Sequence, residues 1–116
     1  MSKDDRIRLR HMLDAAREAL EFSAGRTRAD LDRDRMLVLS LVKSIEILGE
    51  AAGKVSQEVQ DRHPEIPWAD MVGMRNRLIH AYHDVNPEVV WRTIQHDLPP
   101  LVKQLESALS PSDHQA

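Results

Sequence analysis

Proline and glycine are distributed unevenly along this chain, and that distribution limits its fold more than any other feature. All six prolines come after residue 63, and only three glycines interrupt the residues before it. Proline breaks a helix because its ring clashes with the preceding turn and because it has no N–H to donate. The first 63 residues can therefore form long helices, whereas the rest of the chain must be divided into shorter segments.

Apolar residues recur at intervals of three and four in both halves, which is the pattern of helices with one buried face. The sequence predicts a first helix from Asp4 to Ala24 and a second from Asp30 to about Arg62. Shorter helices are expected after Pro67, from Pro87 to about Asp97, and from Pro99 onward. No segment alternates apolar and polar residues as a strand does. We therefore expect an all-α fold, an up-and-down bundle of four to five helices.

The predicted second helix raises the question of what covers it. A helix from Asp30 to Arg62 would be roughly 50 Å long at about 1.5 Å per residue, which is long for a chain of this size. It also contains the small residues Gly49, Ala51, Ala52 and Gly53, although Gly destabilises a helix interior by about 1 kcal/mol relative to Ala. Both features suggest that another helix approaches closely. That helix can belong to a second copy of the chain or to the same chain, and the sequence does not separate the two.

The composition limits the classes of protein to which the chain can belong. Its 116 residues suit one domain, expected over residues 1–110, with 111–116 as a flexible tail. The absence of Cys excludes a disulfide framework, a thiolate nucleophile and a Cys-based zinc site. No apolar run approaches the roughly 20 residues of a membrane span, and the charged N-terminus does not resemble a secretory signal. We therefore expect a cytoplasmic protein, and no cofactor is predicted.

The charge of the chain bears on nucleic-acid binding. The net charge is −3, from 16 basic and 19 acidic side chains, whereas proteins that hold duplex nucleic acid by bulk electrostatics usually have a basic excess. Any nucleic-acid function would need a local basic site. The stretch from Met71 to His83 is a candidate, because it contains Arg75, Arg77 and His80 and no acidic residue.

The segment from Gly73 to Val85 contains side chains suited to cleaving a phosphodiester. Arg75, Asn76, His80 and Tyr82 lie close together in the sequence. A guanidinium can hold a phosphate with two hydrogen bonds and stabilise the charge that develops in the transition state. A histidine can move the proton of an RNA 2′-hydroxyl or of the leaving oxygen. Activation of the 2′-hydroxyl would leave a 2′,3′-cyclic phosphate and would spare DNA.

Helix geometry limits how these side chains can meet. Arg75 and Tyr82 are seven residues apart and would share one face of a helix. His80 is five residues from Arg75, or about 140° around the axis. The two can meet at one phosphate only if the helix ends near His80 or if two copies of the segment face each other. Asn76 precedes His80 by four residues and could orient its imidazole.

The same residues also have plainer interpretations. An Arg–His pair on a helix is more often a capping or salt-bridge feature than a catalytic one, and a tyrosine at a helix end is often only amphipathic. His80 and His83 are three residues apart, a spacing that two metal ligands can have, and Asp84 follows them. No third and fourth ligand of the right kind is evident, so we do not expect a metal site.

A resemblance to a known family changes this balance. The string from Arg75 to Tyr82 matches the R-x4-H-x-Y motif of the HEPN superfamily, and the chain resembles the HepT toxin group over roughly residues 5 to 108. Five further blocks are similar to that group: Ser44 to Ala52, Ile66-Pro67-Trp68, Gly73-Met74, Asp84-Val85-Asn86 and Val89-Val90-Trp91.

The resemblance implies a function and a set of partners. HepT-like proteins are helical homodimers with the two motif copies at the dimer cleft, and they are metal-independent RNase toxins of type VII toxin–antitoxin systems. Their partner is an MntA-type nucleotidyltransferase antitoxin that transfers AMP from ATP to the motif tyrosine. Carried over, Arg75 would bind the scissile phosphate, His80 would be the acid or base, and Tyr82 would be the AMPylation site. Asn76 and Arg77 would support RNA binding.

Two other functions remain open at this point. The chain could be a non-catalytic helical module that binds a nucleotide or a partner protein, or it could be the antitoxin member of such an operon. The composition makes the AMPylation hypothesis easy to test, because Tyr82 is the single tyrosine of the chain.

Overall fold

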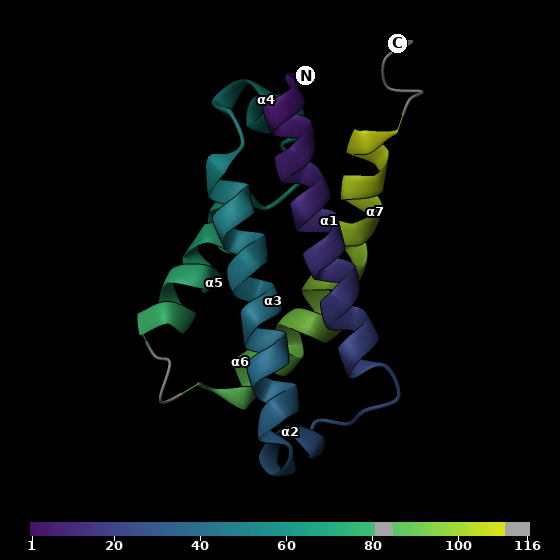
Figure 1. Ribbon diagram of the computed structural model, residues 1–116, viewed down its shortest axis with the longest axis vertical. Helices are drawn as coiled ribbons and strands as arrows, with labels where there is room; N and C mark the ends of the chain where they lie inside the picture. Colours follow the sequence, from purple (N-terminus) through teal and green to yellow (C-terminus); the bar gives the residue numbers. More distant parts are fainter. Residues whose placement is uncertain (81–84, 111–116) are drawn as a thin grey trace.

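The computed structural model describes the backbone of residues 1–80 and 85–110, and these residues contain helices and no strand. The expected all-α fold is thereby confirmed (Figure 1). In chain order the elements are α1 Lys3–Ser23, α2 Asp30–Arg33, α3 Arg35–Lys54, α4 Gln57–Arg62, α5 Trp68–His80, α6 Pro87–Arg92, the π-helical turn η1 Thr93–Asp97 and α7 Leu98–Leu109. None of these helices is long and apolar enough to cross a membrane.

The long elements alternate in direction, as in an up-and-down bundle. Figure 1 shows α1 and α3 running antiparallel at the centre, with the N-terminus and the end of α7 at the same end of the molecule. α3 packs against α1 on one side and α5 on the other, and α7 packs against α1. α3 is therefore the element that connects α5, which carries Arg75, to the rest of the core.

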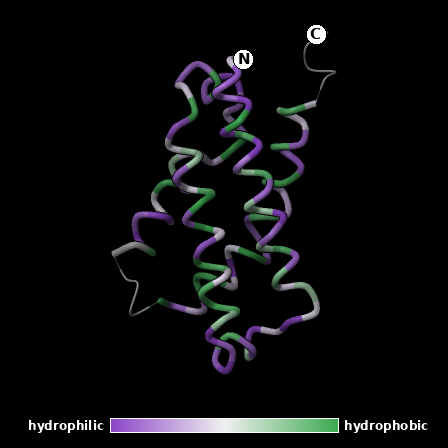
Figure 2. The backbone as a smooth tube through the Cα atoms, viewed as in Figure 1, coloured by the Kyte–Doolittle hydropathy of each residue, from purple (hydrophilic) through white to green (hydrophobic). Residues whose placement is uncertain are grey.

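The core fills the space that these helices enclose. In Figure 2 hydrophobic residues recur along each of the long helices. Most of the largest side chains with no more than 1% of their surface exposed come from α1, α3 and the C-terminal helices, and they include Leu9, Met12, Leu41, Ile94, Leu98, Leu101 and Leu105. Burial of one such side chain is worth about 1.5–3 kcal/mol. The periodicity seen in the sequence thus marks the buried faces correctly.

The predicted single helix from Asp30 to Arg62 is wrong, because the chain bends twice within it. At Asp34 the backbone is extended, and the carboxylate accepts the N–H of Leu37 at 3.0 Å to begin α3. At Ser56 the hydroxyl accepts the N–H of Val59 at 3.3 Å to begin α4. Asp and Ser favour such N-cap positions because their short side chains replace the missing carbonyl of the preceding turn.

The length argument for a second copy therefore no longer holds. α3 has 20 residues and is about 30 Å long, which the other helices of one chain can match. The bend before α4 is also fixed from a distance. Asp5, at the start of α1, accepts the N–H of Ser56 at 2.8 Å and its hydroxyl at 2.7 Å. These hydrogen bonds lower the pKa of Asp5.

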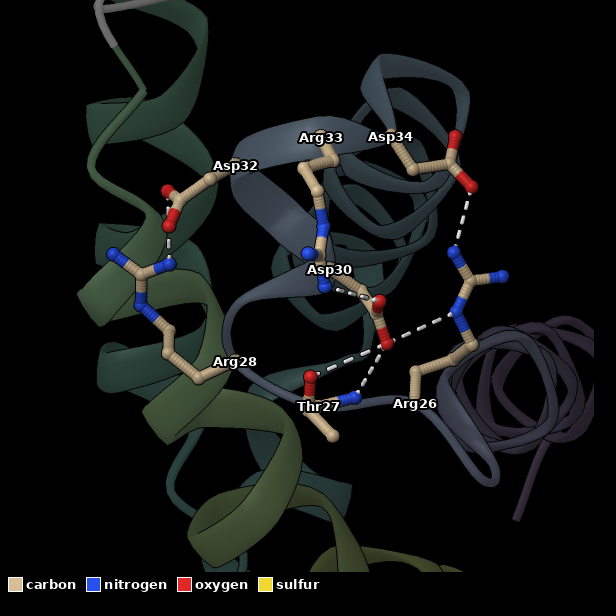
Figure 3. Close-up of polar contacts among 7 residues, drawn as sticks. All are labelled: Arg26, Thr27, Arg28, Asp30, Asp32, Arg33 and Asp34. Carbon is tan, nitrogen blue, oxygen red and sulfur yellow. Dashed lines mark hydrogen bonds and ion pairs between the residues drawn. The ribbon is translucent and has the colours of Figure 1, made fainter.

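A network of charges holds the connection between α1 and α3 (Figure 3). Arg26 contacts Asp34 at 2.7 Å and Asp30 at 3.4 Å. Asp30 also accepts the N–H of Thr27 at 2.7 Å. Gly25 begins this connection with a φ of +73°, a left-handed conformation that glycine adopts without the strain a side chain would cause. The carboxylate of Asp34 thus both caps α3 and anchors the connection.

The prolines at 99 and 100 do not separate two helices as expected. α6, η1 and α7 follow one another without a break in helical structure. Leu98 donates its N–H to the carbonyl of Thr93, five residues back. Pro99 and Pro100 then occupy the first turn of α7, where no N–H is needed. The wider π-helical turn allows helical structure to continue through the two prolines.

Candidate functional site

The expected functional segment lies on α5, and α5 crosses α3 at Gly49. A Cβ atom on Gly49 would collide with the Cβ of Arg75 and would lie 2.7 Å from the carbonyl oxygen of Met71. The backbones of the two helices therefore approach as closely as they do because residue 49 has no side chain. At Gly53 the same added atom would lie 3.6 Å from Val72, which is an ordinary contact. The close approach that the small residues suggested is thus made, at Gly49, by a helix of the same chain.

Arg75 is half-buried, and its guanidinium has few partners. Its Nη1 donates to Oδ1 of Asn76 at 3.1 Å. Its Nε is buried, and no acceptor among the described residues reaches it. The pKa of Glu50 is lowered, first by its hydrogen bond and ion pair with Lys54 and to a lesser degree by the charge of Arg75. Glu50 forms its ion pair with Lys54 and not with Arg75.

One of the two expected arrangements of Arg75 and His80 requires the helix to end near His80. α5 is described from Trp68 to His80, and the expected helix end lies outside the described residues. The side chain of His80 and residues 81–84 lie outside the described part of the chain, and these residues include Tyr82, His83 and Asp84. The roles of His80 and Tyr82 remain predictions.

The two arginines of the motif lie on different sides of α5. Arg75 packs against Gly49 of α3, whereas the exposed Arg77 lines a cavity that opens on the other side of the helix. Arg77 has one close polar contact among the described residues, from Nη2 to the sulfur of Met74 at 3.9 Å. The oxygen of Asn76 accepts a hydrogen bond from Arg75, and its expected contact with the imidazole of His80 lies outside the described side chains.

That cavity was not predicted from the sequence. It has a volume of about 380 Å³. It lies between α5 on one side and η1 and α7 on the other, with side chains of α3 at its base. Polar and charged residues line it, among them Asp70, Arg77, His96 and Asp97. The sequence contains no signal for it, because η1 and α5 are brought together only by their packing on α3. His96, which is exposed, had no apparent function in the sequence.

After the motif, the chain is held in place at the start of α6 by a helix cap and an ion pair. Asn86 accepts the N–H of Glu88 at 2.9 Å, and Pro87 is the first residue of the helix, as the sequence predicted. Arg28, from the connection between α1 and α3, contacts Glu88 at 2.7 Å and Asp32 at 3.0 Å. These two hydrogen bonds, first that to Asp32, raise the pKa of Arg28. The segment that contains Tyr82 thus lies between α5 and an anchored helix start.

Metal binding has no basis in the described residues. No three His, Asp or Glu side chains of residues 1–78 and 85–110 are grouped so that they could hold a metal ion. His83 and Asp84, which with His80 had the spacing of metal ligands, lie outside these residues.

Similar proteins agree on one family. A protein of Caldanaerobacter subterraneus subsp. tengcongensis named "Putative RNase TTE0752" is 36% identical over 107 residues, which are 92% of this chain and 96% of that protein. A protein of Methanocaldococcus jannaschii named "Putative RNase MJ1380" is 30% identical over 91% of this chain and 98% of its own length. A protein of Thermococcus cleftensis named "Probable ribonuclease HepT" is 38% identical over 63% of this chain and 66% of its own length.

No solved structure matches the chain significantly. The sequence profile of the family described as "Ribonuclease HepT-like" matches residues 12–108, which include α5 and the whole of the predicted motif. The chain belongs to the ribonuclease HepT-like family of the HEPN superfamily, as its resemblance predicted.

Proposed function

We propose that this protein is a ribonuclease toxin, and that Arg75 and His80 act at the phosphate that is cleaved. The proposal depends mainly on the family to which the chain belongs, and the surroundings of Arg75 support it. The family profile covers the segment that contains both residues, and three relatives have names that describe them as RNases. Arg75 supports it further, because its Nε is buried without a hydrogen-bond acceptor among the described residues and its Nη1 donates only to the neutral amide of Asn76.

In the proposed reaction the RNA supplies its own nucleophile. His80 removes the proton of a 2′-hydroxyl, and the 2′-oxygen attacks the adjacent phosphorus. The bond from phosphorus to the 5′-oxygen breaks, and that oxygen takes up a proton, so the products are a 2′,3′-cyclic phosphate and a 5′-hydroxyl. Arg75 donates hydrogen bonds to the nonbridging oxygens, on which negative charge increases in the transition state. This chemistry needs no metal ion.

We place the control of the reaction at Tyr82. In the proposal a cognate MntA-like nucleotidyltransferase transfers AMP from ATP to the phenolic oxygen, and pyrophosphate leaves. The expectation that Tyr82 shares a helical face with Arg75 concerns a residue outside the described part of the chain. The proposal is supported by proximity along the chain. Tyr82 follows His80 by two residues, and two residues span at most about 7 Å. An AMP phosphate there would compete with the RNA phosphate for Arg75.

A homodimer is part of the proposal, and it now depends on the family resemblance alone. α3 is short enough to be covered within one chain, and Gly49 packs against α5 of the same chain. Sedimentation equilibrium tests the dimer directly, since the chain has a mass of 13.3 kDa and the dimer has twice that mass.

Expression in cells that lack the partner tests the catalytic assignment. We expect growth arrest from the wild type and none from Arg75→Ala or His80→Ala. Arg92→Ala is the matched control, because Arg92 is an exposed arginine on α6 outside the proposed site, and it should arrest growth like the wild type. Equal growth with all four proteins would leave a non-catalytic binding module as the better description, and arrest by all four would refute the roles of Arg75 and His80.

A further inference from the structure

The cavity beside α5 has an apolar base. Ile45 and Leu48 of α3 and Met71 of α5 line it, and each has no more than 6% of its surface exposed. Pro67 and Pro100 line it from two different segments. At about 380 Å³ the cavity is within the size range of sites for small molecules. Its apolar base and its size suit a flat, ring-shaped group.

The charged groups around this base are not used within the protein. Asp70, Asp97 and Arg77 all line the cavity, yet none of the three forms an ion pair with any described residue. Glu65 differs, because it contacts the imidazole of His63 at 3.4 Å. Opposite charges that share a cavity without pairing remain available to a ligand that carries both an anion and hydrogen-bond donors.

We propose that the cavity binds a guanine nucleotide, with the base on Leu48 and Met71 and the phosphate at Arg77. Guanine presents two adjacent donors, N1–H and N2–H, and one carboxylate accepts both, whereas the matching edge of adenine, cytosine or uracil presents one donor group. Asp70 and Asp97 supply such carboxylates. Met71 and Met74 supply polarizable sulfur, which makes favourable contacts with aromatic rings.

The proposal rests on the proposed ribonuclease function in one respect, namely that the guanine belongs to an RNA strand. Arg77 and Arg75 are two residues apart on α5 and lie on different sides of it, about 3 Å apart along the axis. A strand that crosses α5 can thus place a guanine in the cavity and a neighbouring phosphate at Arg75. The cavity would give the enzyme a preference for the base beside the cleaved bond. A free guanine nucleotide has the same chemistry and is the second source.

Nucleotide binding is measured apart from cleavage, so that failure of the two proposals can be distinguished. 5′-GMP, AMP, CMP and UMP are titrated into the wild-type protein labelled with ¹³C at its methionine methyl groups. We expect GMP to shift the signals of Met71 and Met74, and to leave that of Met36, which is 80% exposed on α3. The other three nucleotides should bind at least about ten times more weakly. Equal binding of all four, or GMP shifts confined to other methionines, would overturn the proposal.

Substitutions then test the assigned contacts. Asp70→Asn with Asp97→Asn should weaken GMP binding about tenfold or more, and Arg77→Gln should weaken GMP more than guanosine. Asp14→Asn is the control, since Asp14 is an exposed carboxylate of α1 outside the cavity, and it should bind GMP as the wild type does. If the cavity variants bind GMP like the control, the site is elsewhere. If spermidine shifts Met71 and Met74 and GMP does not, the cavity takes organic cations and the assignment is wrong.

Mapping the ends of cleaved RNA separates the two sources of guanine. If the base belongs to the substrate, wild-type cuts are enriched beside guanine, and the double variant loses this enrichment while it still cuts. If GMP binds in the cavity and the cuts show no enrichment, the ligand is a free guanine nucleotide.

Discussion

Gly49 of α3 lies directly against Arg75 of α5, so that no side chain fits between them. A Cβ on residue 49 would overlap the Cβ of Arg75. The position of the arginine proposed to act on RNA is therefore set by the packing of two helices. A change that touches no reacting atom can then move Arg75, and this relationship is open to experiment.

Gly49→Ala is expected to destabilise the fold. The new methyl group would lie 2.7 Å from the carbonyl oxygen of Met71, so α5 must shift. Overpacking of this kind costs about 1–3 kcal/mol, against a gain of up to about 1 kcal/mol from the higher helix propensity of Ala, so we expect a net loss of up to about 2 kcal/mol.

Gly53→Ala is the matched control for stability, and it should have the opposite sign. Its methyl group would lie 3.6 Å from Val72, so only the helix-propensity gain applies, up to about 1 kcal/mol. Urea unfolding of both variants measures the two changes in the free energy of unfolding. If both variants gain stability equally, α5 does not approach α3 as closely as described.

The same pair of variants connects packing to activity. Because Gly49→Ala moves the backbone at Arg75, we expect RNA cleavage to slow at temperatures where the variant is still folded. Gly53→Ala should cleave at the wild-type rate. Initial cleavage rates, corrected for the folded fraction by circular dichroism, make the comparison. A wild-type rate in Gly49→Ala would show that the placement of Arg75 by Gly49 does not matter to the reaction.

The contact between Asp5 and Ser56 predicts a dependence of stability on pH. The pKa of Asp5 is lowered, first by the N–H of Ser56 and then by its hydroxyl. The folded state thus favours the ionised carboxylate, and this stabilisation is complete at neutral pH. It is lost as the pH falls below about 4 toward the lowered pKa.

Asp5→Asn should therefore be less stable than the wild type at pH 7, by about 1–2 kcal/mol, and the difference should shrink by pH 3. Asp14→Asn, in the middle of α1 and exposed, should show no such convergence. Thermal unfolding at both pH values measures the effect. A constant difference between Asp5→Asn and the wild type would mean that the charge of Asp5 does not hold the turn before α4.

Arg28 is expected to restrain the start of α6. Its contacts with Glu88 and Asp32 join α6 to the connection between α1 and α3. In Arg28→Gln, hydrogen–deuterium exchange should become faster in a peptide that covers α6, with α7 unchanged. Arg33→Gln is the control, because Arg33 contacts Asp30 within its own turn. Equal exchange in both variants would show that the contact with Glu88 is not a restraint.

The parts of the fold that depend on local pattern were predictable, and those that depend on distant contacts were not. α1 and the start of α6 follow from periodicity, from capping by Asn86 and from Pro87. The bend at Ser56 has a local signal, a serine that caps, but its partner Asp5 lies 51 residues away. The helix break expected at Pro99 and Pro100 was wrong for a related reason. The π-helical turn η1 lets the helical structure continue there, and no local sequence rule indicates such a turn.

The candidate site divides in the same way. Arg75 could be expected from the motif, and the close contact at Gly49 from the cost of a glycine within a helix. The cavity that Arg77 lines could not, because residues from η1 and from α5 meet there only after both pack on α3. Neither Asp70 nor Asp97 carries a sequence signal that separates it from other exposed acids.

The nature of the RNA ends tests the central claim most directly. Purified protein is incubated, in EDTA, with an RNA and with the same strand carrying one 2′-deoxynucleotide at a mapped cleavage site. We expect a 2′,3′-cyclic phosphate and a 5′-hydroxyl at each cut, no cut at the 2′-deoxy position, and no cuts with Arg75→Ala or His80→Ala. Cleavage at the 2′-deoxy position, or wild-type cleavage by either variant, would contradict the account.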